Sequence, residues 1–146
     1  YTVVWALDIS EKGFSFEKGL ALLWENGRTQ PIKTAFVHDP GRLPEETTDA
    51  EERTAALYGT GSITQERRQT GFDNYETQDD HAMHIIGTAT DANAGHYYYV
   101  KNSWGVDNPY DGHIFVSEDY FRYKTISIMV NKNALDHEKL NLLNIK

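Results

Sequence analysis

Two stretches with β-strand composition, joined by a short turn, most constrain how this chain can fold. They cover residues 81–88 and 97–104, and the second opens with three consecutive tyrosines. Aromatic and β-branched side chains favour strands, and the segment from Asp91 to Gly95 between them has the composition of a turn. A connection this short predicts antiparallel neighbours, so the start of the first strand and the end of the second meet at one edge of a sheet.

The remaining segments predict further strands and a group of helices. Residues 1–9 carry apolar side chains at most positions, which predicts a strand buried on both faces or nearly so. Other strands are expected at residues 20–24, 113–116 and 125–130. The dipeptide Asn26-Gly27 predicts a tight hairpin, and residues 33–44 predict a surface loop.

Residues 45–75 are charged and rich in helix formers, and they are expected to form a helical insertion. Thr48 and Ser62 each stand three residues before a Glu or Gln, the spacing of a capping box, which predicts helices over 49–57 and 62–75. A helical turn is expected at 118–123 and a short helix at 135–145. Strands interleaved with a separate helical segment predict an α+β domain built on an antiparallel sheet or small barrel.

Composition sets the limits on size, compartment and partners. The chain has 146 residues, 14 basic and 22 acidic side chains for a net charge of −8, and no cysteine. This length predicts a single domain over residues 1–146, with a core that needs no disulfide. The negative charge without a basic cluster argues against nucleic acid as a partner, even with the tyrosine run at 97–99.

The longest apolar stretch, Val3–Leu7, is far short of the roughly 20 residues that span a membrane. The chain starts at Tyr1 inside an apparent strand, so it is expected to be a trimmed piece.

Two polar residues are expected to meet at the shared edge of the first two strands. His81 opens one strand, and Asn102 stands near the end of the other. A side-chain amide oxygen can accept the N–H of one imidazole nitrogen, which orients the ring and leaves the other nitrogen facing a nucleophile. Trp104, two residues beyond Asn102 and so on the same strand face, is expected to cover that hydrogen bond from water. The pattern indicates an oriented catalytic base.

Each of these residues also has a purely structural interpretation. A lone strand histidine is more often a half-buried residue bonded to a neighbouring carboxylate, here Asp79 or Asp80. Asn102 alone fits a strand-end residue bonded to nearby backbone, and Trp104 alone fits the core. Only the joint pattern carries the catalytic hypothesis.

A metal site is weighed and disfavoured. Residues 79–84 hold two carboxylates and two imidazoles, which are possible zinc ligands. Residues three apart in a strand point to opposite faces, so His81 and His84 would not bind one ion. The segment 91–95 partly resembles a calcium loop, but Asn102 stands where that loop needs a bidentate Glu. We therefore expect no metal and no cofactor.

These motifs resemble a known family. Lys101 to Gly105, after an aromatic strand and a strand opening with His-Ala, resembles the papain-like cysteine peptidases. Four further stretches resemble the bleomycin hydrolase and bacterial aminopeptidase C branch: residues 5–14, 64–69, 72–75 and 79–81. The resemblance implies the C-terminal, sheet-rich half of a papain-like fold. It makes His81 the catalytic imidazole, Asn102 the residue that orients it and Trp104 the shield.

The resemblance also implies what this chain lacks. In the family, the nucleophilic cysteine and an oxyanion-hole glutamine lie in the preceding half of the polypeptide, which would therefore be this chain's partner. The thiol is activated because pairing with histidine lowers its pKa from about 8.5 to about 3–4 in papain itself. With no cysteine, the isolated chain is expected to be inactive and to expose an apolar face. The resemblance further implies peptide substrates, aminopeptidase specificity and a hexamer. It also implies a cytoplasmic location, with a periplasmic or exported location as the alternative.

Two other function classes remain open. A papain-like fold that lacks a thiol throughout would be a catalytically inactive binding domain. A stand-alone metalloprotein is the third hypothesis. A Gln followed by Cys-Trp at a helix start, upstream of Tyr1, would distinguish the peptidase from the binding domain, and metal analysis of the purified protein would test the metalloprotein.

Overall fold

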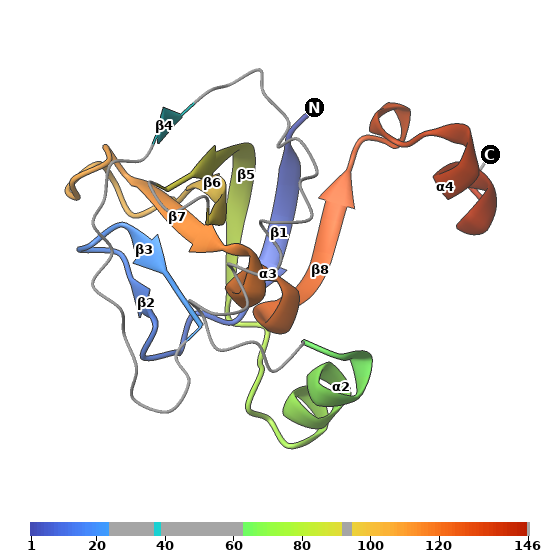
Figure 1. Cartoon of the computed structure of the whole chain (residues 1–146), viewed down its shortest axis with the longest axis horizontal. Helices are drawn as coiled ribbons and strands as arrows, with labels where there is room; N and C mark the ends of the chain where they lie inside the picture. The colour runs from blue at the N-terminus through green and yellow to red at the C-terminus, as the bar shows by residue number, and fades with distance from the viewer. Residues whose placement is uncertain (24–36, 39–62, 92–94, 146) are drawn as a thin grey trace.

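A computed structural model describes residues 1–23, 37–38, 63–91 and 95–145 and shows an α+β fold (Figure 1). The sheet has eight strands, in the order β2-β3-β7-β6-β5-β1-β8, with β4 paired to β5. The strands are β1 (Val3–Leu7), β2 (Phe14–Ser15), β3 (Leu20–Ala21), β4 (Val37–His38), β5 (His81–Thr90), β6 (His96–Lys101), β7 (His113–Ser117) and β8 (Thr125–Val130). The helices are α2 (Gln65–Asp73), α3 (Glu118–Lys124) and α4 (His137–Leu142), and a 3₁₀ turn covers Lys132–Ala134.

The predicted hairpin forms the middle of this sheet. β5 and β6 are antiparallel, with Thr90 opposite His96 at the turn end and His84 opposite Lys101 at the other end. The prediction of antiparallel neighbours is therefore confirmed. Asp91 closes the turn by accepting the Gly95 N–H at 2.8 Å through its side chain.

The sheet contains one parallel pair of strands that was not predicted, and of the two predicted architectures it forms the open sheet. It is antiparallel apart from the pair β3–β7, where Leu20 lies opposite Phe115 in a parallel arrangement. Among the described strands, β2 and β8 stand at the two ends of the path without pairing to each other, so the sheet is open rather than a closed barrel. β4 also lies within residues 33–44, which the sequence predicts as loop, because Val37 and His38 pair with β5.

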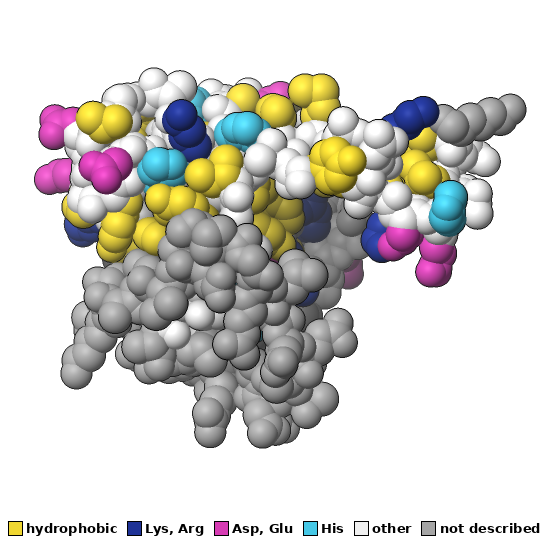
Figure 2. Space-filling model, turned by 90° about the horizontal axis from the view of Figure 1, so that it is seen from above, with side chains coloured by type: hydrophobic (Ala, Val, Ile, Leu, Met, Phe, Trp, Pro, Cys, Tyr) yellow, Lys and Arg dark blue, Asp and Glu magenta, His cyan; other side chains and the backbone are white. Residues whose placement is uncertain are grey.

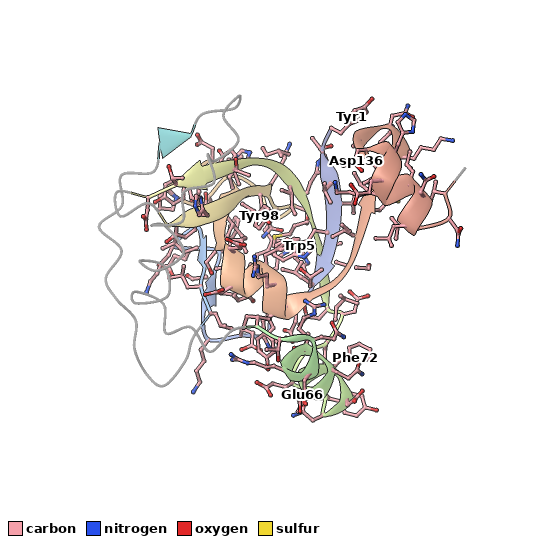
Figure 3. All side chains as sticks on the ribbon, turned by 45° about the vertical axis from the view of Figure 1, so that its right-hand side comes forward. Tyr1, Trp5, Glu66, Phe72, Tyr98 and Asp136 are labelled. Atoms are coloured by element: carbon pink, nitrogen blue, oxygen red, sulfur yellow. The ribbon has the colours of Figure 1, made fainter. Side chains whose placement is uncertain are left out.

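β1 is buried mainly on one face, so the prediction of a strand buried on both faces or nearly so is wrong. Trp5 and Leu7 are fully buried, whereas Val4, which points to the opposite face, is 39% exposed. Helix α3 covers the buried face, since Phe121 packs against Trp5 and Tyr98 with ring centroids 5.3 and 4.3 Å apart. Figure 3 shows Trp5 and Tyr98 beside α3.

The helices begin and end close to the predicted positions. Thr64, rather than Ser62, caps α2, because its hydroxyl accepts the Arg67 N–H at 3.2 Å. Helix α3 ends one residue beyond its predicted range, and α4 lies inside its predicted range and is shorter at both ends. The predicted hairpin at Asn26 and helix at 49–57 lie outside the described residues. The described helices include none that is long and apolar enough to cross a bilayer.

Apolar side chains from five strands and α3 form the core. The main buried cluster combines residues of β1, β3, β5, β6, β7 and α3: Trp5, Leu7, Ala21, Met83, Ile85, Val100, Ile114, Val116 and Tyr120. Other apolar side chains stay at the surface, and on the face seen from above they gather beside histidines (Figure 2). The core thus fixes the central strands, from whose ends the site residues extend.

Candidate active site

The structure brings His81 and Asn102 into direct contact. His81 is the first residue of β5, and Asn102 directly follows the last residue of β6. His81 Nε2 lies 2.8 Å from Asn102 Oδ1. The meeting predicted from the antiparallel pairing is therefore confirmed, although the catalytic roles of the two residues remain a prediction.

The backbone next to Asn102 fixes which ring nitrogen carries the proton. The Ser103 N–H donates to Asn102 Oδ1 at 2.8 Å. A backbone N–H can only donate, so the atom facing it, and facing His81, is the amide oxygen. His81 Nε2 must then donate to that oxygen, which leaves Nδ1 unprotonated in the neutral ring. Within the described residues, Nδ1 has no hydrogen-bond partner.

Asn102 is itself held firmly. It is 5% exposed, and its backbone N–H donates to Gly112 O at 3.2 Å. Its Nδ2 is buried and has no acceptor among the described residues. Such an unpaired buried donor is costly and rare. An acceptor at this position would have to come from outside the described part of the chain.

Trp104 contacts the imidazole, but for a different reason than predicted. The ring centroids of Trp104 and His81 lie 5.0 Å apart. β6 ends at Lys101, so strand alternation does not place Trp104. Its indole packs edge-on against Phe14 and Phe16 of the segment that contains β2, with centroids 5.9 and 5.4 Å apart. Trp104 is 48% exposed and His81 is only partly buried, so the contact does not seal the imidazole from solvent.

Asn108 organises the loop that carries these residues, and the sequence reasoning missed it. Its Nδ2 donates to Phe16 O at 3.1 Å and to His113 O at 2.8 Å. Its Oδ1 accepts the Gly112 N–H at 2.8 Å and the Tyr110 N–H at 3.0 Å. The turn-forming composition of residues 107–112 marks a loop, but nothing in it identifies this side chain as the centre of the loop.

Two glycines allow the loop to close. Gly105 and Gly112 have φ angles of +86° and +82°, which side-chain-bearing residues rarely adopt. A Cβ on Gly112 would lie 2.2 Å from Gly105 O, whereas one on Gly105 would meet nothing within 4 Å. Position 112 therefore requires glycine, because any side chain there would clash with the Gly105 carbonyl.

The other histidine of β5 points to a different environment. His84 Nε2 lies 2.7 Å from Thr2 Oγ1. In the described ranges, no three carboxylate or histidine side chains gather in a way that could hold a metal ion. The arrangement at His81 is thus an oriented imidazole with one free basic nitrogen, suited to proton transfer.

A comparison with protein families identifies the family to which this chain belongs. Residues 61–146 match the model of the Peptidase C1-like family, which is more than half of the chain. The chain therefore belongs to the Peptidase C1-like family, and its papain-like fold assignment is confirmed.

Among solved structures, the chain is similar to PepW from Lactobacillus rhamnosis HN001 (DR20). The TM-score is 0.57 at 16% sequence identity, and the match covers 98% of this chain. It covers 26% of PepW, so the chain spans about a quarter of the length of that structure. At this identity the likeness establishes the fold. The search of curated proteins found no match.

Proposed function

We propose that this chain supplies the histidine and asparagine of a cysteine peptidase site. The observation that carries the proposal is the hydrogen bond from His81 Nε2 to Asn102 Oδ1, with its direction set by Ser103. It leaves Nδ1 as the basic nitrogen, which is the atom a thiol proton needs. Membership of the Peptidase C1-like family supports the same chemistry.

In the proposed reaction, His81 acts first as base and then as acid. Nδ1 takes the proton from a cysteine thiol, and the thiolate sulfur bonds to the carbonyl carbon of the substrate amide. As the C–N bond breaks, the imidazolium gives its proton to the leaving amine. Nδ1 then takes a proton from water, whose oxygen displaces the sulfur and releases the acid. Asn102 keeps the ring in position throughout.

The nucleophile must come from elsewhere, because this chain contains no cysteine. We place it in the preceding half of the same polypeptide, with a glutamine that stabilises the oxyanion. A helix N-terminus there would favour the thiolate. The chain covers only about a quarter of PepW, which leaves room for such a half. Residues 1–146, with a helical insertion at 45–75, would then be the C-terminal part, inactive when alone.

The finer identity rests on the resemblance to the bleomycin hydrolase and aminopeptidase C branch. We propose an aminopeptidase that acts on peptides in the cytoplasm and assembles as a homo-hexamer. No nucleic-acid or membrane partner is proposed. The absence of cysteine favours one competing function, an inactive binding domain of the same fold.

The test is peptide hydrolysis by the longest natural polypeptide that contains this chain. We expect it to cleave fluorogenic aminoacyl amides, to cleave N-acetylated ones far more slowly, and to lose activity on thiol alkylation. His81→Ala should lower kcat by about 10²–10⁴-fold. The matched control is His84→Ala, on the same strand but bonded to Thr2, which should stay within about threefold. An inactive wild-type protein, or equal effects of the two variants, would refute the proposal.

A further inference from the structure

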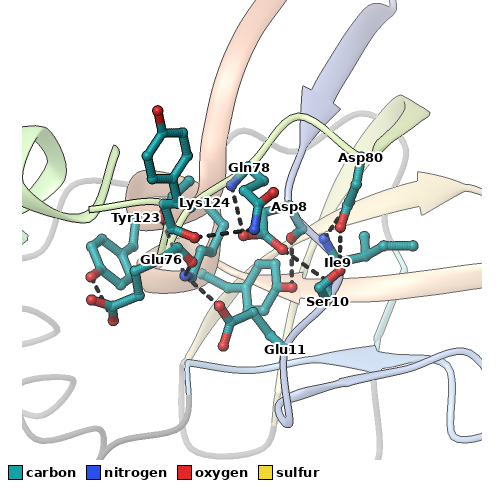
Figure 4. A network of polar contacts seen from close by, with 12 residues as sticks. Asp8, Ile9, Ser10, Glu11, Glu76, Gln78, Asp80, Tyr123 and Lys124 are labelled. Atoms are coloured by element: carbon teal, nitrogen blue, oxygen red, sulfur yellow. Dashed lines mark hydrogen bonds and ion pairs between the residues drawn. The ribbon is translucent and has the colours of Figure 1, made fainter. Parts of the chain in front are cut away.

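The strand β5 enters the site from a polar cluster that the proposed reaction does not use. This cluster joins three parts of the chain: residues 8–11 after β1, residues 76–80 before β5, and helix α3 (Figure 4). Its central carboxylate is Asp8, which is 2% exposed. A buried carboxylate is retained only where hydrogen bonds compensate its lost hydration.

The Asp8 side chain links two segments of backbone. Its Oδ1 accepts the Ser10 N–H at 2.8 Å, and its Oδ2 accepts the Gln78 N–H at 2.9 Å. Asp80 makes the reverse link: its Oδ1 accepts the Ile9 N–H at 2.9 Å, and its Oδ2 accepts the Ser10 hydroxyl. Two carboxylates thus clamp the segments 8–10 and 78–80 together, directly before His81.

The backbone of Asp8 ties this clamp to α3. Its N–H donates to Lys124 O at 3.1 Å, and its carbonyl accepts the Tyr120 hydroxyl at 2.8 Å. Tyr120 is fully buried in the main core cluster. Asp8 therefore connects residues 78–80 both to helix α3 and to the main buried core cluster.

From these contacts we infer that Asp8 is a positioning residue for His81. The inference deepens the proposed function and rests on it, since it assigns how the imidazole is kept against Asn102. His81 is paired to Leu7 at the end of β1 and is the residue after Asp80. Loosening the clamp would therefore let the first residue of β5 shift, and the bond to Asn102 would open more often.

The test measures how fast the His81 Nε2–H proton exchanges with water, by NMR of the ¹⁵N-labelled chain. His81→Gln identifies the signal. In Asp8→Asn an NH₂ group can replace the oxygen that faces the Gln78 N–H. Two donors then face each other, and the hydrogen bond from Gln78 is lost. We expect exchange to accelerate about tenfold or more, the factor that corresponds to one buried hydrogen bond.

The matched control is Asp91→Asn, at the far end of β5. Asp91 is also buried, and its carboxylate also accepts hydrogen bonds, among them those from the Gly95 N–H and the Tyr97 hydroxyl. It should lose comparable stability yet change the exchange of the His81 proton by less than about threefold. Unchanged exchange in Asp8→Asn, or equal acceleration in both variants, would overturn the inference.

A milder pair of variants decides the matter if Asp8→Asn does not fold. Tyr120→Phe removes only the hydroxyl bonded to Asp8 O, and Tyr97→Phe removes only the one bonded to Asp91. Faster exchange in Tyr120→Phe alone supports the inference, and equal exchange in the two overturns it. The measurement involves no peptide hydrolysis, so an inactive enzyme would refute the proposed function without affecting this result.

Discussion

Replacing Lys124 with methionine should destabilise the fold more than any other removal of a single charge described above. Lys124 is 1% exposed, although it belongs to a short surface helix. Its ammonium group donates to Glu76 O at 2.9 Å and to Thr77 Oγ1 at 3.2 Å, and it forms an ion pair with Glu11. It also lies 4.6 Å from the ring centroid of Tyr123.

The size of the effect follows from what remains after the cation is removed. Breaking a buried ion pair by removing one partner costs about 3–5 kcal/mol, because the other charge is left uncompensated. The Glu11 side chain is 29% exposed and can recover part of its hydration. Methionine also fills most of the space. We therefore expect a loss of about 3 kcal/mol in the free energy of unfolding, or roughly 6–12 °C in Tm for a chain of this length.

Urea unfolding followed by circular dichroism measures this loss, with Lys139→Met as the control. Lys139 pairs with Asp136, but both side chains are more than half exposed. Water and salt screen such a pair, so its removal should leave the unfolding midpoint nearly unchanged. If Lys124→Met unfolds at the same urea concentration as Lys139→Met, with equal slopes, the buried cation contributes nothing and the reasoning is wrong.

Two further predictions concern the site loop and the core. Gly112→Ala should destabilise the chain at least twice as much as Gly105→Ala. Gly105→Ala carries only the left-handed strain of about 1–2 kcal/mol, whereas a Cβ at position 112 would also lie 2.2 Å from a carbonyl oxygen. Thermal unfolding of the two variants measures the difference. Burial, with the nearby carboxylates of Glu11 and Asp8 as smaller causes, raises the pKa of Tyr120 well above its usual 10. Above pH 10 the unfolded chain releases this proton and the folded chain keeps it, so the free energy of unfolding should fall by about 1.4 kcal/mol per pH unit. Tyr120→Phe should flatten that slope in urea titrations between pH 9 and 11.

The β5–β6 hairpin and the contact of His81 with Asn102 were predictable because they depend on local geometry. A turn of a few residues forces antiparallel pairing, and that pairing brings the start of one strand to the end of the other. Trp104 was also expected beside His81, but alternation along a strand was the wrong reason. β6 ends three residues earlier, and contacts with Phe14 and Phe16 determine where the indole lies.

The features that the sequence did not reveal are long-range or contradict average behaviour. β2 and β3 have two residues each, too few for any periodicity, and β3 finds its parallel partner β7 more than ninety residues away. Lys124 ends a helix in which four of the seven residues are charged, and a lysine is normally exposed. Its burial depends on Glu11 and on residues 76–77, which only the folded chain brings together.

The pH dependence of cysteine alkylation tests the central claim most directly. In the polypeptide that contains both this chain and the proposed cysteine, the rate of reaction with iodoacetamide reports the thiolate fraction. If His81 pairs with the thiol, the reaction should stay fast down to about pH 4, as a pKa of about 3–4 requires. His81→Ala should move the midpoint to about 8.5, the value of an ordinary thiol. A midpoint that is the same in both proteins would show that this imidazole does not face the sulfur.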